Sequence, residues 1–149
     1  MRSVAQRVAS ARVRVGDETV AEMGEGLLAL VGVGRGDSLD DARALAEKLV
    51  HLRVFDDAAG VMNQSLLDTR GTLGVVSQFT LFGDARKGRR PSYGEAAAPA
   101  EAETLIDALI EHARALGVTV VTGRFRADMD VELLNRGPVT LLLDTRRLF

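Results

Sequence analysis

The sequence contains no cysteine, only two histidines and only three prolines among 149 residues. Without cysteine the chain has no disulfide, no thiolate nucleophile and no metal site with cysteine ligands. No apolar run approaches the roughly 20 residues that a membrane-spanning helix requires. The first residues alternate like a strand and lack the apolar block of a signal peptide. We therefore expect a cytoplasmic protein with no membrane association.

Charge of neither sign dominates, because 19 Lys and Arg residues face 21 Asp and Glu residues and the net charge is −2. A global basic field that attracts nucleic acid is therefore excluded. A local basic patch is present in the long polar segment between residues 82 and 99, which contains four basic residues close together: Arg86, Lys87, Arg89 and Arg90. This basic cluster is either a solvated loop or a phosphate-binding loop. The proline and the aromatic residue that follow, Pro91 and Tyr93, favour an ordered loop.

Hydrophobic periodicity predicts mostly strands with two helices. Ser38 has the character of an N-cap, and apolar residues at helical spacing follow over residues 39–52 and again over residues 105–116. Strand patterns occupy residues 4–8, 13–15, 19–23, 27–33, 71–81, 118–122, 129–134 and 139–143, whereas residues 61–70 show no clear pattern. We predict one α/β domain over residues 1–149. Its mostly β, layered sheet or half-barrel would carry two helices on one face, in three α/β/β layers.

Both histidines, His51 and His112, lie inside the predicted helices rather than in loops. A Ser-His-Asp triad therefore lacks an obvious general base. Asp128 and Asp130 are two residues apart and share one face of a strand, but no third ligand type accompanies them, so we predict no metal site.

Gly32-x-Gly34-x-Gly36 stands between a predicted strand and a predicted helix, which is the setting of a dinucleotide-binding turn. The fingerprint requires a third glycine at the position that Asp37 occupies. The segment is therefore interpreted as a plain flexible turn.

Ser77, Gln78, Phe79 and Thr80 place two hydroxyl groups and an amide at the end of an apolar strand. Strand alternation puts Ser77 and Thr80 on opposite faces, so the two hydroxyls converge only where the strand bulges or ends. Two interpretations stay open. The polar residues either satisfy a layer boundary or form a site in which Ser77 or Thr80 acts.

Gly137-Pro138 interrupts two strongly β-patterned runs, residues 131–134 and 139–143. Proline has no N–H to donate to a strand ladder, and glycine adopts backbone conformations that a side chain forbids. The pair therefore serves either a tight hairpin or the recognition of a ligand by main-chain carbonyl groups.

Five segments, in this order, resemble the D-aminoacyl-tRNA deacylase family of the bacterial and eukaryotic type. They are Gln6-Arg7-Val8, Ser77-Gln78-Phe79-Thr80-Leu81, the run from Arg86 to Ser92, Gly123-Arg124-Phe125 with Ala127-Asp128-Met129, and Asn135-x-Gly137-Pro138-Val139-Thr140. The resemblance covers nearly the whole chain. Arg136, inside the last segment, departs from the family pattern without touching a residue whose role is carried over.

The resemblance implies a cytosolic homodimer, without a cofactor, that hydrolyses the ester of D-aminoacyl-tRNA and of mischarged glycyl-tRNA. It implies a cis Gly137–Pro138 bond whose carbonyl oxygens enter the partner subunit's active site and face the chiral centre of the substrate, with Arg7 holding that loop. Ser77, Gln78, Phe79 and Thr80 would line the other wall, and Phe125 and Met129 would flank the terminal adenosine.

For the chemistry, the resemblance implies main-chain N–H groups around Gln78 and Phe79 as oxyanion donors, assisted by the 2′-hydroxyl of the substrate ribose. Two alternatives remain. Thr80 or Ser77 is the nucleophile of an esterase, or the chain is a non-catalytic RNA-binding module that uses the basic cluster.

Overall fold

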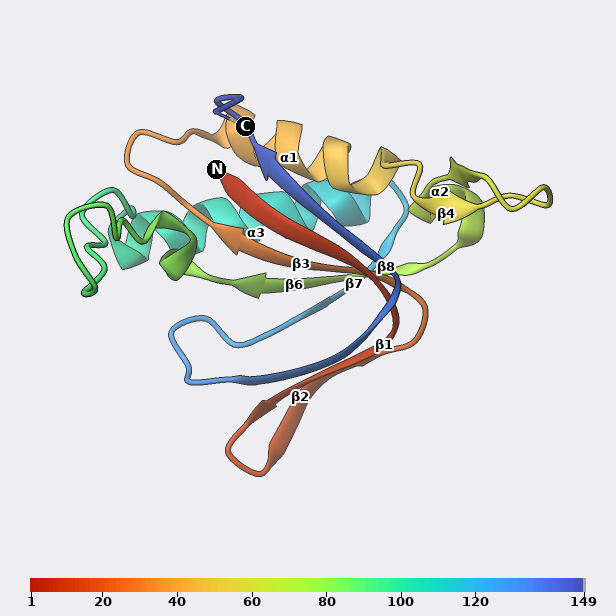
Figure 1. Cartoon of the computed structure of the whole chain (residues 1–149), viewed down its shortest axis with the longest axis horizontal. Coiled ribbons are helices and arrows are strands. Elements are labelled where there is room, and N and C mark those ends of the chain that lie inside the picture. The colour runs from red at the N-terminus through yellow and green to blue at the C-terminus, as the bar shows by residue number, and fades with distance from the viewer. Residues whose placement is uncertain (149) are drawn as a thin grey trace.

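The computed structural model describes residues 1–148 and is built around one strongly bent sheet (Figure 1). Its strands run in the order β2-β1-β3-β6-β7, and β8 pairs along β1. The strands of this sheet are β1 (Arg2–Val15), β2 (Glu18–Met23), β3 (Gly26–Gly32), β6 (Thr72–Ser77), β7 (Thr119–Thr122) and β8 (Asp130–Asp144), and a separate pair is formed by β4 (Phe55–Asp56) and β5 (Met62–Gln64). The helices are α1 (Leu39–His51), α2 (Leu66–Thr69) and α3 (Pro99–Ala115), with a 3₁₀ turn η1 (Phe79–Phe82). Within the described part of the chain, no helix is both long and apolar enough to cross a membrane.

Helices α1 and α3 lie on one face of the sheet, and the outer halves of β1 and β8 fold with β2 beneath the other face (Figure 1). Strand β3 has both faces buried. Leu27, Ala29 and Val31 pack into the core with the two helices, and Leu28 packs into a second core with Val8 and other residues of the lower layer. This explains the nearly continuous apolar run of β3. The predicted α/β half-barrel with two helices on one face is confirmed.

Ser38 begins α1 as its sequence position predicts. Its hydroxyl accepts a hydrogen bond from the Asp41 N–H at 3.3 Å, and the Asp41 carboxylate accepts one from the Ser38 N–H at 2.9 Å. Ser65 and Asp68 form the same capping box at α2, inside the segment without a clear pattern. A helix of 4 residues is too short to produce hydrophobic periodicity.

The strand predicted over residues 71–81 is too long. Strand β6 ends at Ser77, and η1 begins two residues later. A close backbone approach accompanies the end of the strand, because a Cβ atom on Gly32 would lie only 2.9 Å from the Gln78 carbonyl oxygen. Apolar residues alone do not distinguish a strand from a short helical turn, and Phe79 and Leu81 therefore predict a strand that continues.

The hairpin interpretation of Gly137-Pro138 is also wrong, because β8 runs through the pair as one strand. Both of its halves pair antiparallel with the same strand, β1. Gln6 pairs with Thr140 and Val8 pairs with Asn135, so residues 136–139, four in all, lie opposite Arg7 alone. The excess residues bulge out of the ladder, where the missing N–H of proline costs no hydrogen bond.

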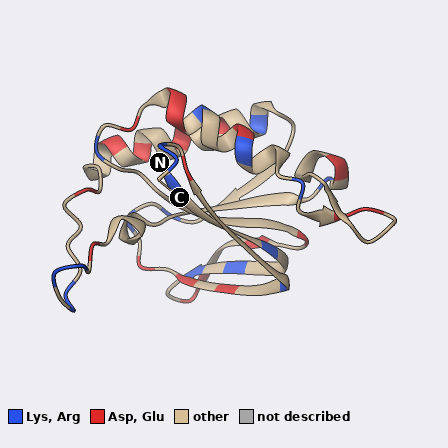
Figure 2. Ribbon diagram, turned by 45° about the horizontal axis from the view of Figure 1, so that its top comes forward, with Lys and Arg blue, Asp and Glu red and all other residues tan. Residues whose placement is uncertain are grey.

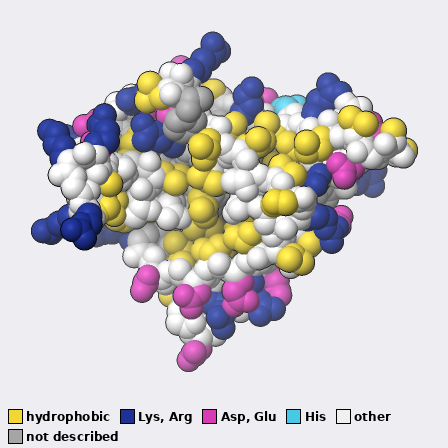
Figure 3. Space-filling model, in the orientation of Figure 1, with side chains coloured by type: hydrophobic (Ala, Val, Ile, Leu, Met, Phe, Trp, Pro, Cys, Tyr) yellow, Lys and Arg dark blue, Asp and Glu magenta, His cyan; other side chains and the backbone are white. Residues whose placement is uncertain are grey.

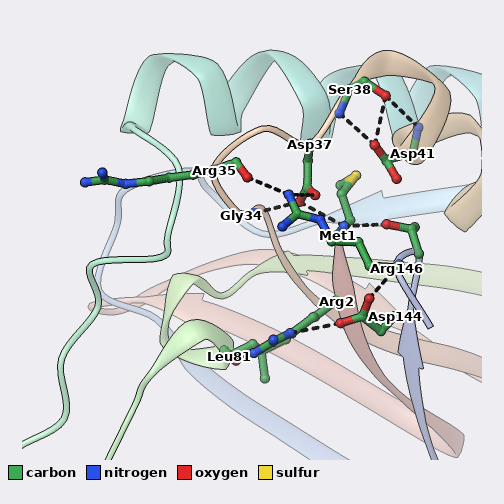
Figure 4. A network of polar contacts seen from close by, with 11 residues as sticks. Met1, Arg2, Gly34, Arg35, Asp37, Ser38, Asp41, Leu81, Asp144 and Arg146 are labelled. Carbon is green, nitrogen blue, oxygen red and sulfur yellow. Dashed lines mark hydrogen bonds and ion pairs between the residues drawn. The ribbon is translucent and has the colours of Figure 1, made fainter. Parts of the chain in front are cut away.

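Asp37, which takes the place of the third glycine in the dinucleotide fingerprint, is a structural residue (Figure 4). Its carboxylate lies 2.8 Å from the N-terminal amine of Met1 and 2.9 Å from Arg146, and it accepts a hydrogen bond from the Gly34 N–H at 2.6 Å. The turn therefore ties the N-terminus and the C-terminal segment to the start of α1, and these contacts hold in place a turn that the sequence predicted to be flexible.

Candidate active site

A cavity of about 690 Å³ opens where β6 ends. Six of the predicted site residues line it together: Ser77, Gln78, Phe79, Thr80, Phe125 and Met129. The first four come from the end of β6 and from η1, and the last two come from the loop between β7 and β8. Residues from the start of α3 and from the loop before it close the cavity, and Tyr93 is among them.

The residues at the end of the strand line this cavity and differ in whether their main-chain N–H groups are already hydrogen-bonded. The Gln78 N–H donates to the Val31 carbonyl oxygen at 2.7 Å and is therefore not available to a ligand, which corrects the expectation for this residue. The N–H groups of Phe79 and Thr80, at the start of η1, make no hydrogen bond to any residue among 1–148. The free donors of the segment are thus those of Phe79 and Thr80, because the first N–H groups of a helical turn have no partner within it.

The Thr80 hydroxyl is oriented by the side chain of Gln78. Gln78 Nε2 donates to Thr80 Oγ1 at 2.7 Å. No histidine reaches this hydroxyl. His112 Nε2 lies 2.9 Å from Glu47 Oε1, and His51 Nδ1 lies 2.9 Å from the Glu47 carbonyl oxygen, so both rings sit on helix α1 or α3 beside Glu47. Among residues 1–148 there is also no group of three or more His, Asp or Glu side chains that is suited to hold a metal ion.

Arg7 contacts the Gly137-Pro138 loop on the opposite strand. Its Nε donates to the Arg136 carbonyl oxygen at 3.0 Å, and its Nη1 donates to the Val54 carbonyl oxygen at 2.8 Å. The Gly137–Pro138 peptide bond is cis, and Gly137 has a φ of 130°. A Cβ atom on Gly137 would lie 2.9 Å from both Arg7 Nη2 and Val139 Cγ2, and the positive φ strains any side chain at this position.

The loop and the cavity occupy different parts of the chain. Arg7 and Arg136 line a separate hollow of about 230 Å³, beside Phe55 and Gly71. Neither Gly137 nor Pro138 is among the described residues that line the larger cavity. The predicted site residues therefore form two groups that one copy of the chain does not bring together.

The basic cluster lies on a projecting loop, coloured blue at the left of Figure 2. Asp84 and Ser92 exchange backbone hydrogen bonds of 2.8 and 2.9 Å, which close the loop at its base. Arg86 is paired within the loop, because its Nη2 donates to the Asp84 carboxylate at 2.7 Å. Hydrogen bonds from Arg86 hold the pKa of the Asp84 carboxyl far below its usual range. Lys87, Arg89 and Arg90 make no ion pair with another described residue. Three cations are thus free to meet a ligand at this loop.

A family model for D-Tyr-tRNA(Tyr) deacylase matches residues 4–144. The chain belongs to the D-Tyr-tRNA(Tyr) deacylase family. A relative named D-aminoacyl-tRNA deacylase from Anaeromyxobacter dehalogenans is 55% identical over 149 residues, which is 100% of both chains. A relative of the same name from a Roseiflexus species is 56% identical and covers 97% of this chain and 94% of its own. Membership in this deacylase family makes the chain a hydrolase that acts on ester bonds, rather than a non-catalytic RNA-binding module.

Two solved structures carry the same fold as this member of the deacylase family. A protein titled c-Myc DNA unwinding element binding protein has a TM-score of 0.92 at 33% identity, over 97% of this chain and 98% of its own. A structure titled as a probable eukaryotic D-amino acid tRNA deacylase has a TM-score of 0.79 at 18% identity, over 95% of this chain and 97% of its own. The second likeness concerns the fold alone.

Proposed function

We propose that the chain hydrolyses D-aminoacyl-tRNA and mischarged glycyl-tRNA in the cytoplasm, and that it spares L-aminoacyl-tRNA. The observation that carries this proposal is the Gly137-Pro138 loop. Gly137 has no side chain and Pro138 has no N–H, the loop is held by Arg7 through the Arg136 carbonyl oxygen, and neither residue lines the cavity of its own chain. Such a loop is suited to fill the cavity of another copy.

A homodimer brings the two groups of site residues together. Strand β8, which carries the loop, exposes three leucines, Leu133, Leu134 and Leu142. Hydrophobic side chains gather on this face of the molecule (Figure 3), as on surfaces that pack against a partner. In the dimer, the loop of each protomer enters the cavity lined by Ser77, Phe79 and Thr80 of the other.

The chemistry requires little from side chains because an aminoacyl ester is already activated. Water attacks the ester carbonyl carbon, and the N–H groups of Phe79 and Thr80 stabilise the oxyanion that develops. The bond to the ribose 3′-oxygen then breaks, the 3′-oxygen takes up a proton, and the free amino acid leaves. The ribose 2′-hydroxyl assists the attacking water, in agreement with a cavity that no histidine reaches. One well-placed oxyanion donor contributes roughly 10²–10³ in rate.

Selectivity follows from steric exclusion. The carbonyl groups of Gly137 and Pro138 face the Cα atom of the substrate, and Phe125 and Met129 flank the terminal adenosine. A D-residue directs its side chain away from this wall, glycine has none, and an L-residue drives its side chain into the carbonyl groups. Exclusion by a clash requires no contact with the accepted side chain, so D-amino acids of different size are accepted.

Paired hydrolysis assays with D-tyrosyl-tRNA and L-tyrosyl-tRNA test this function. We expect rapid release of D-tyrosine while the L-ester survives, and comparable rates would refute the proposal. A tRNA that ends in 2′-deoxyadenosine tests the assistance by the ribose. We expect poor cleavage of that substrate, and unchanged turnover would exclude a role for the 2′-hydroxyl.

A further inference from the structure

Two aromatic side chains at the cavity form a pair that the proposed chemistry does not use. The rings of Phe79 and Tyr93 pack edge to face, with centroids 5.1 Å apart and planes at 71°. Both line the cavity, yet Phe79 is 59% exposed and Tyr93 is 39% exposed. Large aromatic surface that stays open to water beside a cavity is available to a ligand with a flat apolar face.

The backbone fixes Tyr93 before any ligand arrives. The exchange of hydrogen bonds between Asp84 and Ser92 immediately precedes it, and its carbonyl oxygen accepts from the Ala96 N–H at 3.0 Å. A Cβ atom on Gly83 would lie only 3.1 Å from Tyr93 Cε1, so one edge of the ring lies beside Gly83. A ring held in this way loses little conformational freedom when a ligand stacks on it.

The loop that carries the basic cluster ends directly before Tyr93. Asp84 and Ser92 close the loop that carries Lys87, Arg89 and Arg90, and Tyr93 is the next residue. Stacking surfaces next to unpaired cations are the combination by which proteins hold single-stranded nucleic acid. The aromatic pair and the cations are thus placed to take the bases and the phosphates of one strand.

We propose that Phe79 and Tyr93 form a stacking subsite for the unpaired nucleotide that precedes the terminal adenosine of the RNA substrate, with its phosphates directed to Lys87, Arg89 and Arg90. This subsite rests on the proposed function. With the terminal adenosine in the cavity, a strand that runs from the cavity to the cations passes Phe79 and Tyr93, because both rings line the cavity and Tyr93 directly follows the loop that carries the cations. Stacking is tolerant of base identity, because each base has a π-face.

Two small substrates distinguish the contribution of this subsite to binding from that of the rest of the site. D-Tyrosyl-adenosine ends before the subsite, whereas D-tyrosyl-cytidylyl-adenosine carries one more nucleotide. In the variant Tyr93→Leu, we expect KM for the dinucleotide ester to rise roughly tenfold, with kcat unchanged and with KM for the mononucleotide ester unchanged. Tyr93→Phe keeps the ring and is expected to behave as the unsubstituted protein. If Tyr93→Leu alters both substrates equally, or neither, the subsite is refuted.

Equilibrium binding of cytidylyl-adenosine and of adenosine gives the same comparison without hydrolysis. If the protein cleaves neither ester, the proposed function fails. The subsite then stands only if Tyr93→Leu weakens binding of the dinucleotide roughly tenfold relative to adenosine, and it is refuted if both ligands respond alike. Unchanged thermal unfolding of Tyr93→Leu shows that the substitution leaves the fold intact, and Tyr93→Phe supplies the matched reference in both assays.

Discussion

Arg7 Nε lies 3.0 Å from the carbonyl oxygen of Arg136, to which it donates a hydrogen bond across the β1–β8 ladder. Arg136 is the residue before Gly137, so this bond holds the loop at the point where it leaves the ladder. The same guanidinium donates to the Val54 carbonyl oxygen and lies 3.2 Å from Asp56. One side chain thus ties the loop to the segment that contains β4.

Arg7→Lys should lower kcat/KM for D-tyrosyl-tRNA about tenfold, because a single ammonium group does not reproduce the fork of the guanidinium. The matched control is Arg12→Lys on the same strand, where the arginine pairs with Glu22 at the surface. The control should leave kcat/KM unchanged. Equal effects of the two substitutions would show that Arg7 does not position the loop.

Phe79→Pro removes a main-chain N–H that has no partner among the described residues, at the first position of η1, where proline is tolerated. We expect kcat for D-tyrosyl-tRNA to fall by about 10²–10³. Phe79→Ala removes the ring but keeps the N–H, so kcat should be retained while KM rises. If the proline variant keeps its kcat, the Phe79 N–H is not an oxyanion donor.

Thr80→Ala distinguishes main-chain catalysis from a threonine nucleophile. The hydroxyl accepts a hydrogen bond from Gln78, and no histidine is placed to remove its proton. We therefore expect Thr80→Ala, which loses an orienting contact of about 1 kcal/mol, to retain activity within roughly tenfold. Ser77→Ala should retain activity as well. Abolished turnover in Thr80→Ala, together with an acyl-enzyme trapped in the unsubstituted protein, would instead favour the nucleophile.

Asp37→Asn should destabilise the fold strongly. The Met1 amine lies 2.8 Å from the Asp37 carboxylate, and the side chains of both residues are 0% exposed. Removal of one partner from a buried ion pair costs about 3–5 kcal/mol. Asp40→Asn is the control, because the Asp40 side chain is 92% exposed and, within residues 1–148, pairs only with Arg43. Urea unfolding measures both variants. Equal midpoints would contradict the structural role of Asp37.

Local signals in the sequence were sufficient for much of the fold. The spacing of apolar residues in α1 and the continuous run of β3 follow from which faces are buried, and Ser38 marks the helix start through its own hydrogen bonds. The predictions failed where the outcome depends on distant partners. The β8 bulge is set by pairing with β1 more than 100 residues earlier in the chain, and the end of β6 is accompanied by the close approach of Gly32.

In the candidate site, too, local features could be predicted from the sequence, whereas features that depend on distant partners could not. The sequence placed Ser77, Phe79 and Thr80 at a strand end, and the residues do line one cavity. It did not predict that the Gln78 N–H is already used, because its acceptor, Val31, lies on another strand. It also gave no reason to place Tyr93 in the cavity, since the contact with Phe79 depends on the path of the loop between them.

In the proposed homodimer, the loop of one protomer completes the cavity of the other. Gly137→Ala should damage the loop, because the residue has a φ of 130° and its Cβ atom would crowd Arg7. Homodimers of this variant should cleave L-tyrosyl-tRNA alongside the D-ester. Gly24→Ala is the control, since no described residue other than its two chain neighbours comes within 4 Å of the added Cβ.

The decisive measurement is the ratio of L- to D-tyrosyl-tRNA hydrolysis in a purified heterodimer of one Phe79→Pro protomer and one Gly137→Ala protomer. If the loop acts across the interface, the intact cavity receives the intact loop, and the heterodimer cleaves the D-ester while sparing the L-ester. If each loop serves its own cavity, the only active cavity keeps the damaged loop. The heterodimer would then retain the relaxed ratio of the Gly137→Ala homodimer, which would contradict the account.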